Sequence, residues 1–191
     1  EAPAAGNIGT PFCKYAYDYN SNKKLDWIIA ELSSYQIEIA GEIKPKIGIW
    51  TTFTPDHLER HKTLENYFNI KNHLLKNSDI RIYNYDDRYL KSSKKKLAKG
   101  IWVSLDYKNI DIEDCNFWLD EKGYIVEKGI TLFHSDALKL KGKHNILNLL
   151  LATAAAREIG LTGKNIKNSL KKYIQLPHRL ETIYCAKNLE V

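Results

Sequence analysis

The chain has 191 residues, 43% of them hydrophobic and 11% aromatic, which is enough to bury a core and excludes an intrinsically disordered protein. No apolar run approaches the roughly 20 residues that a membrane-spanning helix needs, and the amino end lacks a signal-peptide pattern, so we expect a cytoplasmic protein. A net charge of +6 is compatible with a phosphate-rich ligand or with nucleic acid, so charge alone does not choose between them.

The first feature along the chain is a glycine-rich loop at residues 6–11, GNIGTP. Two glycines beside a Thr-Pro pair predict a tight loop followed by a helix, with Thr10 as N-cap and Pro11 as the first helical residue. Free backbone N–H groups in such a loop can hold a phosphate, but plain turn formation also explains the glycines. Asn7 is the residue that turn formation needs least.

Residues 25–32 (LDWIIAEL) are short and almost continuously apolar, which predicts a buried parallel strand. Glu31 lies at the carboxyl end of this strand and is followed by Ser33 and Ser34, at the edge where ligands of open α/β sheets bind. A carboxylate at this edge can hold Mg²⁺. Alternatively, these side chains cap the helix that follows.

A second predicted strand, residues 46–53, is followed by the sequence TPDH, which contains Asp56 and His57. Because the carboxyl ends of parallel strands meet at one edge of a sheet, we expect both side chains to lie near Glu31. A lone histidine is more often structural, so the interpretation of His57 depends on its neighbours.

Residues 63–77 predict an amphipathic helix that begins with Thr63 as N-cap. Its apolar stripe contains Leu64, Phe68, Lys71 and Leu75. A lysine on this stripe must lose its charge, extend its amine to solvent or meet an anion, because burying an unpaired ammonium is costly. A neutral amine can also capture CO₂, and the resulting carbamate can bind Mg²⁺ as a carboxylate does.

Further strands are predicted at residues 79–85 and 100–105. The lysine-rich segment 91–99 between them is interpreted as a solvated helix end rather than a nucleic-acid-binding surface. Over residues 115–140 the pattern changes to short alternating segments around a Lys-Gly turn at 122–123. This pattern predicts an antiparallel meander inserted beside the main sheet.

Residues 144–159 predict a strongly apolar helix that ends at Gly160. Asn145 and Asn148 lie three residues apart at its start and therefore on one face. Either amide can cap the helix, and both also match the donor and acceptor groups of a purine base.

A final helix is predicted at residues 164–174, before Pro177, and a strand-like run follows at 180–185. Arg179, in the sequence PHRLE between them, can bind a phosphate or form an ion pair between domains. Strands that alternate with helices indicate an α/β fold, with a mostly parallel sheet flanked by helices and a small antiparallel meander.

The three cysteines, Cys13, Cys115 and Cys185, are widely spaced and form no CxxC pair. This spacing argues against a disulfide framework or a zinc site, so we expect reduced, structural thiols.

Five segments, taken in order, resemble consecutive motifs of the Mur ligase family. They are GNIGTP, ELSSYQIE, TPDHLERH followed by ENYFNIK, LKGKHNILN and PHRLE, and they span residues 6–181. The first two are most similar to the member that adds D-glutamate to UDP-N-acetylmuramoyl-L-alanine. The resemblance implies ATP-dependent amide formation through an acyl phosphate, in peptidoglycan precursor synthesis.

The resemblance implies a catalytic set of Glu31, His57 and Lys71. Glu31 is expected to bind the Mg²⁺ that bridges the ATP phosphates, while His57 and a carbamylated Lys71 bind a second Mg²⁺. Asn7, together with His57, is expected to contact the UDP-linked substrate.

The resemblance also implies a nucleotide site and a domain boundary. Asn145 and Asn148 are expected to face the adenine, and Arg179 to reach the nucleotide from the domain junction. Residues 1–176 correspond to a central ATP-binding domain, and residues 177–191 to the start of a carboxyl-terminal domain.

The chain contains no methionine and no GxxGKT phosphate-binding loop, so we expect an internal piece of a longer enzyme. The piece alone is expected to be inactive and prone to aggregate through an uncovered sheet edge, while the full-length enzyme is expected to be a monomer. Three alternatives stay open: another Mur ligase such as the diamino-acid-adding enzyme, a basic nucleic-acid-binding module, and a non-catalytic nucleotide-binding domain.

Overall fold

The computed structural model describes residues 2–20, 25–108, 110–111, 113–172, 185–186 and 189–190. The chain divides into two compact units. Unit 1 comprises Glu1–Pro45 and Pro55–Asn77, and unit 2 comprises Lys46–Thr54 and Ser78–Val191.

The described residues of unit 1 form a small parallel strand pair and four helices. Its elements are β1 (Ala4–Gly6), α1 (Phe12–Asn20), β2 (Ile29–Glu31), α2 (Ser34–Ile39), α3 (Leu58–His61) and α4 (Leu64–Asn77). The two strands pair in parallel, with Gly6 opposite Glu31. Both α2 and α3 pack against α4, so the polar residues that follow β2 are held in one unit with Asp56 and His57.

The prediction of a buried strand at residues 25–32 is wrong in length and burial. β2 has three residues, all exposed, and Ile29 keeps 61% of its surface accessible. Within the described part of unit 1, β2 pairs only with β1, so its apolar side chains lack a covering layer. The parallel direction of the strand was predicted correctly.

Local capping explains where the helices of unit 1 begin. Ser33 and Gln36 form a capping box at α2, in which each side chain bonds the other residue's backbone N–H. Thr63 Oγ1 accepts from the N–H of Asn66 over 3.0 Å at the start of α4, which confirms the predicted N-cap. The glycine-rich loop leads into a helix as predicted, but α1 begins only after Pro11.

Lys62, between α3 and α4, has an unusual backbone conformation. Its φ of 67° and ψ of −44° lie in a region that side chains with a Cβ rarely adopt. Its N–H donates to Leu58 O over 2.8 Å and its Nζ donates to Glu59 O over 2.8 Å, so the turn is held by local hydrogen bonds.

Lys62→Gly is therefore expected to raise the free energy of unfolding by about 1 kcal/mol, because relief of backbone strain exceeds the added entropy of the unfolded chain. Lys62→Ala is the matched control, since it removes the ammonium but keeps the Cβ. Chemical denaturation of both variants measures the difference. A glycine variant no more stable than the alanine variant contradicts the strain argument.

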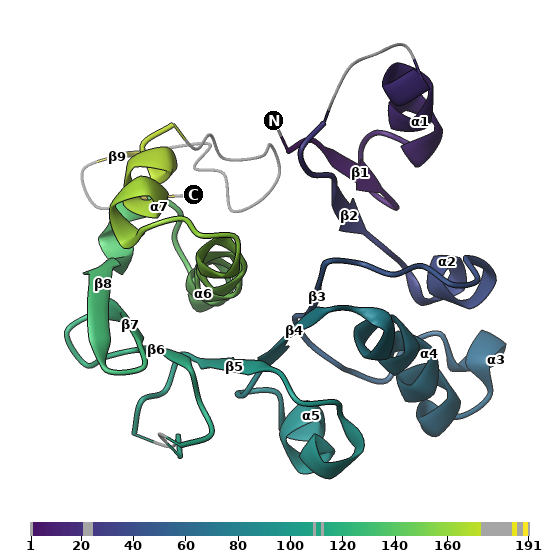
Figure 1. Ribbon diagram of the computed structural model, residues 1–191. Helices are drawn as coiled ribbons and strands as arrows, with labels where there is room; N and C mark the ends of the chain where they lie inside the picture. The colour runs from purple at the N-terminus through teal and green to yellow at the C-terminus, as the bar shows by residue number, and fades with distance from the viewer. Residues whose placement is uncertain are drawn as a thin grey trace. The chain divides into compact units, whose positions relative to one another are not determined.

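Unit 2 is built on a six-stranded sheet in the order β3-β4-β5-β6-β7-β8 (Figure 1). Its strands are β3 (Ile47–Trp50), β4 (Ile80–Asn84), β5 (Ile101–Ser104), β6 (Phe117–Leu119), β7 (Tyr124–Glu127) and β8 (Ile130–His134). Strands β3 to β6 are parallel neighbours, and β6 to β8 are antiparallel. This arrangement confirms the α/β fold and the predicted positions of the strands β3, β4 and β5.

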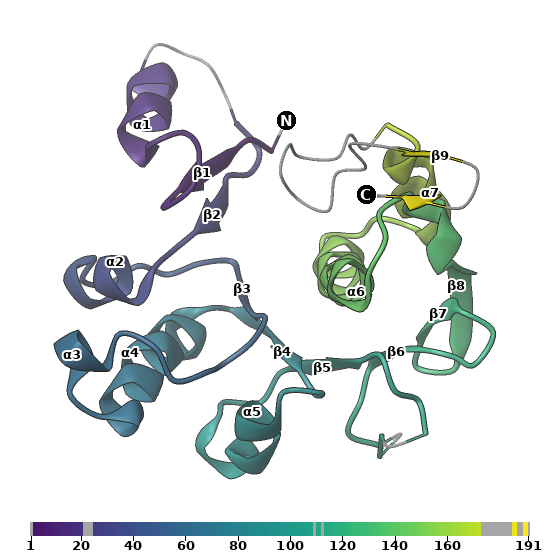
Figure 2. The same cartoon turned by 180° about the vertical axis from the view of Figure 1, so that it is seen from behind.

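Helices cover both faces of the sheet in unit 2. They are α5 (Arg88–Ser92), α6 (Lys143–Glu158) and α7 (Gly163–Leu170), with short 3-10 turns η1 (Lys94–Lys96) and η2 (Ser135–Ala137). α6 lies against β4, β5 and β6 and α7 against β8, whereas α5 lies on the opposite face (Figures 1 and 2). The core between α6 and the sheet includes Ile82, Val103, Phe117, Ile125 and Leu150, each at most 1% exposed.

Gly160 ends α6 as predicted. Its φ is +89°, its N–H donates to Arg157 O over 3.0 Å, and the N–H of Leu161 donates to Ala156 O over 3.0 Å. These two bonds satisfy carbonyl groups that the end of the helix leaves unpaired.

The meander is antiparallel as predicted, but it is not an insertion beside the sheet. β6 pairs in parallel with β5, so the meander extends the main sheet. The lysine-rich segment 91–99 begins in the last turn of α5 and forms a largely solvated helix end. Lys91 Nζ lies 4.2 Å from the ring centre of Tyr85, and Lys94 pairs with Asp114.

At the carboxyl end, β9 (Cys185–Ala186) and β10 (Leu189–Glu190) form a short antiparallel pair. The predicted domain boundary after Leu176 and most of the strand-like run 180–185 lie outside the described residues. Among the described residues, no helix combines the length and apolarity that crossing a membrane requires.

Candidate functional site

Four of the seven candidate site residues lie in unit 1. These are Asn7, Glu31, His57 and Lys71. Asn145 and Asn148 lie in unit 2, and Arg179 lies outside the described residues.

Asn7 and Glu31 are joined through their backbones. The N–H of Asn7 donates to Glu31 O over 2.8 Å, directly beyond the last paired residues of β1 and β2. Gly6 makes this approach possible: its φ is +122°, and a Cβ there would overlap the carbonyl oxygen of Glu31. The loop therefore serves close backbone approach, and both side chains remain exposed for ligands.

His57 has a left-handed backbone conformation, with φ 54° and ψ 28°, at the start of α3. Such conformations are uncommon outside glycine and concentrate at functional sites. Asp56 flanks the residue: its Oδ1 accepts from His57 N–H over 2.8 Å, and its Oδ2 lies 3.4 Å from His57 Nε2. The His57 side chain is 40% exposed, so its ring is accessible to a ligand.

Lys71 is partly buried on α4, as its position on the apolar stripe predicts. Burial lowers the pKa of its amine, while the negative charges of Glu31 and Asp56 raise it in part. Lys71 Nζ also lies 5.3 Å from the ring centre of Tyr67. The lowered pKa favours the neutral amine, which is the form that can react with CO₂.

The donor groups in unit 1 are of types that can bind Mg²⁺ together with phosphate oxygens. Among the described residues, no group of three or more His, Cys, Asp or Glu side chains is arranged to hold a metal. Mg²⁺ is usually bound by one or two protein carboxylates together with water and substrate phosphates, so such a group is not required. Glu31 and Asp56 supply accessible carboxylates, and both act electrostatically on Lys71.

Sequence patterns missed a set of residues packed beside His57 and Lys71. His61 is 1% exposed, and its Nε2 lies 2.9 Å from Oγ of the buried Ser34. Its ring stacks on Tyr67 with centroids 5.3 Å apart. The available signal was the spacing of His61 four residues after His57, which places both histidines on one side of a helical turn.

In unit 2, the structure gives Asn145 a structural bond. Its Nδ2 donates to Lys141 O over 2.7 Å, which ties the first turn of α6 to the preceding loop. Asn148 is exposed on the next turn. Gly142 is the N-cap of α6 and makes no side-chain capping bond, so the capping alternative is wrong for Asn145, whose Oδ1 can still accept from a ligand.

Cysteine chemistry has no visible part in the site. Cys115 is buried, its Sγ donates to Trp102 O over 3.3 Å, and burial raises its pKa to about 12. Cys13 is exposed and unpaired, and the side chain of Cys185 lies outside the described residues.

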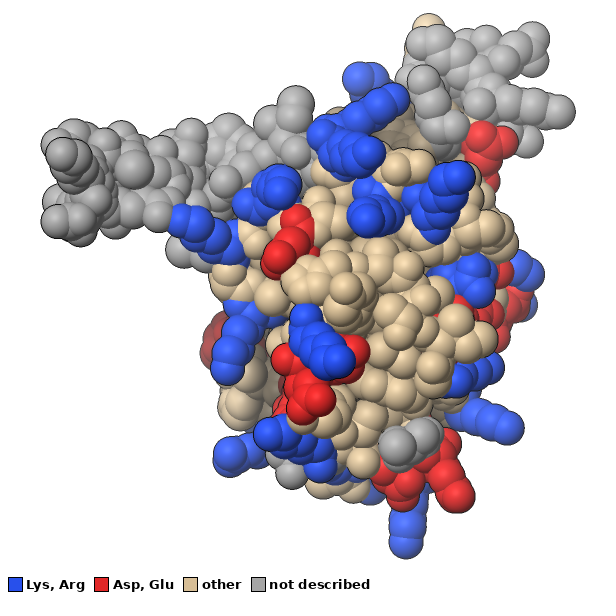
Figure 3. All heavy atoms as spheres, turned by 90° about the vertical axis from the view of Figure 1, so that its left-hand side faces the viewer, with Lys and Arg blue, Asp and Glu red and all other residues tan. Residues whose placement is uncertain are grey.

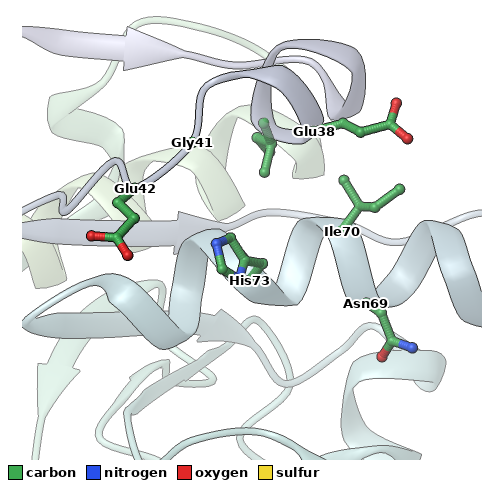
Figure 4. Close-up of a pocket in the computed structure, with 7 residues that line it drawn as sticks. Glu38, Gly41, Glu42, Asn69, Ile70 and His73 are labelled. Carbon is green, nitrogen blue, oxygen red and sulfur yellow. The ribbon is translucent and has the colours of Figure 1, made fainter.

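An open hollow of about 480 Å³ lies between α2 and α4, lined in part by Ile37, Glu42, Ile70 and His73 (Figure 4). The helical period places His73 on a different side of α4 from Lys71. The hollow therefore does not coincide with the candidate metal-binding residues.

Comparisons with known proteins identify the family of this chain. Residues 13–156 match the family model described as the Mur ligase middle domain. The chain is 58% identical over 190 residues to the UDP-N-acetylmuramoylalanine--D-glutamate ligase of Prochlorococcus marinus strain MIT 9312, and 60% identical over 191 residues to that of strain MIT 9515. Each match covers 100% of this chain and 40% of the relative, so the chain spans well under half the length of these curated relatives.

Solved structures show the same fold at low identity. UDP-N-acetylmuramate-alanine ligase MurC from Thermotoga maritima has a TM-score of 0.61 and 16% identity, covering 98% of this chain and 48% of that one. MurF from Acinetobacter baumannii has a TM-score of 0.58 and 13% identity, covering 97% and 48%.

Proposed function

Because the chain belongs to the Mur ligase family, we propose that it is the middle part of a cytoplasmic ligase that joins D-glutamate to UDP-N-acetylmuramoyl-L-alanine with ATP. The relatives at 58% and 60% identity are D-glutamate ligases, which supports this specificity. The domain boundary after Leu176 and a monomeric state for the complete protein belong to the same proposal.

The observation that carries the proposal is the environment of Lys71. Burial lowers the pKa of this lysine, and two carboxylates of the same unit, Glu31 and Asp56, interact electrostatically with its amine. His57 lies directly beside Asp56. A lysine of this kind suits carbamate formation, which converts a cation into an oxygen ligand beside the other donors.

The proposed reaction has two steps. The carboxylate of UDP-N-acetylmuramoyl-L-alanine attacks the γ-phosphorus of ATP, ADP leaves, and an acyl phosphate forms. The amine of D-glutamate then attacks the acyl carbon, phosphate leaves, and the nitrogen loses a proton to give the amide. Bound Mg²⁺ supplies positive charge that offsets the phosphate charge during transfer.

The roles of the residues follow from their donor groups. Glu31 provides a carboxylate for one Mg²⁺, and His57 with the Lys71 carbamate provides nitrogen and oxygen ligands for the other. Asn7 and His57 contact the UDP-linked substrate. Gly6 holds the Asn7 backbone against that of Glu31, so the substrate and metal positions are set together.

The nucleotide base is proposed to bind at the start of α6. Asn145 and Asn148 present amides one turn apart there to face the adenine, and we propose that Arg179 binds the nucleotide from the domain junction. The bond from Asn145 Nδ2 to Lys141 O leaves its Oδ1 as the acceptor for a base amino group.

A basic nucleic-acid-binding module explains the net charge of +6 but not the residues of unit 1. On the face shown in Figure 3, basic side chains are interspersed with acidic ones around a broad uncharged area. Continuous phosphate backbones are bound by basic surfaces with few acids, so this face gives the alternative little support.

The test is phosphate release by the complete protein that contains this chain. Release is expected only when ATP, UDP-N-acetylmuramoyl-L-alanine and D-glutamate are all present. Release with a diamino acid in place of D-glutamate moves the assignment to the diamino-acid-adding ligase. An absence of release with either amino acid rules out the ligase function.

A further inference from the structure

The short helix α3 follows His57 but is too short to be stable by itself. It has four residues, and isolated helices of this length do not form in water. The carbonyl of His57 accepts from the N–H groups of Arg60 and His61 over 3.1 and 3.0 Å. The placement of His57 therefore depends on what attaches α3 to the rest of unit 1.

Two hydrogen-bonded side-chain pairs attach α3 to α2, in addition to contacts with the Tyr35 ring. Arg60 Nη2 donates to Glu38 Oε2 over 2.9 Å at the exposed side. His61 Nε2 lies 2.9 Å from Ser34 Oγ in the interior, where the two residues are 1% and 2% exposed. Exposed ion pairs contribute little, whereas breaking a buried hydrogen bond leaves a partner unsatisfied. The contact between His61 and Ser34 is therefore the stronger attachment.

His61 also contacts the residues that surround His57 and Lys71. Its ring stacks on Tyr67 with 15° between the planes, and Lys71 Nζ lies 5.3 Å from the centre of the same Tyr67 ring. Tyr35 packs against both histidines, with ring centroids 5.1 Å from His57 and 5.4 Å from His61. One buried imidazole thus links the neighbours of both candidate metal ligands.

The second nitrogen of His61 indicates why an imidazole matters here. Nδ1 is buried and has no hydrogen-bond partner among the described residues. An unsatisfied buried polar atom costs about 1–3 kcal/mol, and a phenyl ring of similar shape avoids that cost. The directed contact with Ser34 is the feature that imidazole supplies and phenyl lacks.

We propose that His61 is a positioning residue that fixes His57 and Lys71 for metal binding. It acts through its hydrogen bond to Ser34 and its stacking on Tyr67, and it touches neither metal nor substrate. This inference rests on the proposed function, because it requires Mg²⁺ to bind at the residues of unit 1.

The experiment measures metal binding directly in the complete protein. Mn²⁺ is titrated in the presence of a non-hydrolysable ATP analogue, and free Mn²⁺ is followed by electron paramagnetic resonance. His61→Phe keeps a ring and removes the bond, His61→Gln keeps an amide nitrogen near the Nε2 position, and Ser34→Ala removes the partner. Arg60→Met, which removes the exposed attachment, is the matched control.

His61→Phe and Ser34→Ala are each expected to weaken Mn²⁺ binding about tenfold or more, as changes beside metal ligands commonly do. The double variant is expected to be no weaker than the weaker single variant, because both changes remove one bond. His61→Gln is expected to bind more tightly than His61→Phe, and Arg60→Met to bind as the wild type does.

Mn²⁺ binding by His61→Phe equal to that of the wild type overturns the positioning role, even where the variant melts at a lower temperature. If the double variant loses as much Mn²⁺ affinity as the two single variants together, the positioning role is also overturned, because the two residues then act separately. Failure of the wild type to bind Mn²⁺ instead overturns the proposed metal sites. The two failures are therefore distinguishable.

Discussion

Lys71→Ala is expected to lower kcat of the complete ligase by about a thousandfold or more, because the proposed carbamate ligand of the metal is lost. Lys71→Arg is expected to be equally inactive, since a guanidinium stays protonated and cannot capture CO₂. Steady-state phosphate release measures both variants. Lys76→Ala, at an exposed lysine near the end of the same helix, is the control and is expected to keep full activity.

Added formate or acetate is expected to restore part of the activity of Lys71→Ala, because a free carboxylate can occupy the space that the side chain leaves. It is expected to have no effect on Lys71→Arg, whose side chain fills that space. If the arginine variant instead works within about tenfold of the wild type, a positive charge is what the reaction needs, and the carbamate assignment is wrong.

The pH dependence of the wild type is expected to reflect the same chemistry. Burial lowers the pKa of Lys71, so more of the amine is neutral near pH 8 than for an exposed lysine. Below the folded-state pKa the amine becomes increasingly protonated and forms less carbamate, so activity is expected to fall as pH decreases. Added bicarbonate is expected to reduce that fall, which assays at several bicarbonate concentrations can measure.

Gly6→Ala is expected to lower the free energy of unfolding by about 3 kcal/mol, the upper range for a strained backbone position. The added Cβ meets the backbone carbonyl of Glu31, which cannot rotate away as a flexible side chain can. Chemical denaturation measures this loss. Activity is expected to fall as well, because the substitution separates Asn7 from Glu31.

Gly9→Ala is the matched control for Gly6→Ala. Gly9 also has a positive φ, +79°, but a Cβ there meets nothing within 4 Å. Its substitution is expected to cost only about 1 kcal/mol of backbone strain. If both substitutions lower the free energy of unfolding equally, the positive φ alone explains the loss, and the close approach of Gly6 to Glu31 does not contribute.

Local signals explain which parts of the fold were predictable. The N-cap of α4 at Thr63 and the end of α6 at Gly160 depend on hydrogen bonds between residues close in sequence, and both predictions are confirmed. The apolar runs that became β4 and β5 are buried in the sheet, as their composition indicates. Helix caps and buried strands of this kind can be predicted from local residue patterns.

The features that could not be predicted depend on contacts between residues that are far apart in sequence. The exposure of β2 depends on which strands pair with it. An apolar run predicts that a strand is buried, but it does not identify the strands or helices that cover it. His61 and Ser34 are 27 residues apart, and although each lies within one of the motifs, neither motif predicts the hydrogen bond between them. The grouping of Glu31, His57 and Lys71 in one unit was expected, but the ring of Tyr67 beside Lys71 was not.

The position of α6 in the chain also has a consequence for biosynthesis. β4, β5 and β6 precede α6 in sequence, yet α6 covers their apolar face. While the ribosome makes the meander, that face has no cover, and Ile82, Val103 and Phe117 remain open to other nascent chains or to chaperones. The interval between synthesis of β5 and emergence of α6 is thus the period in which this chain most needs protection.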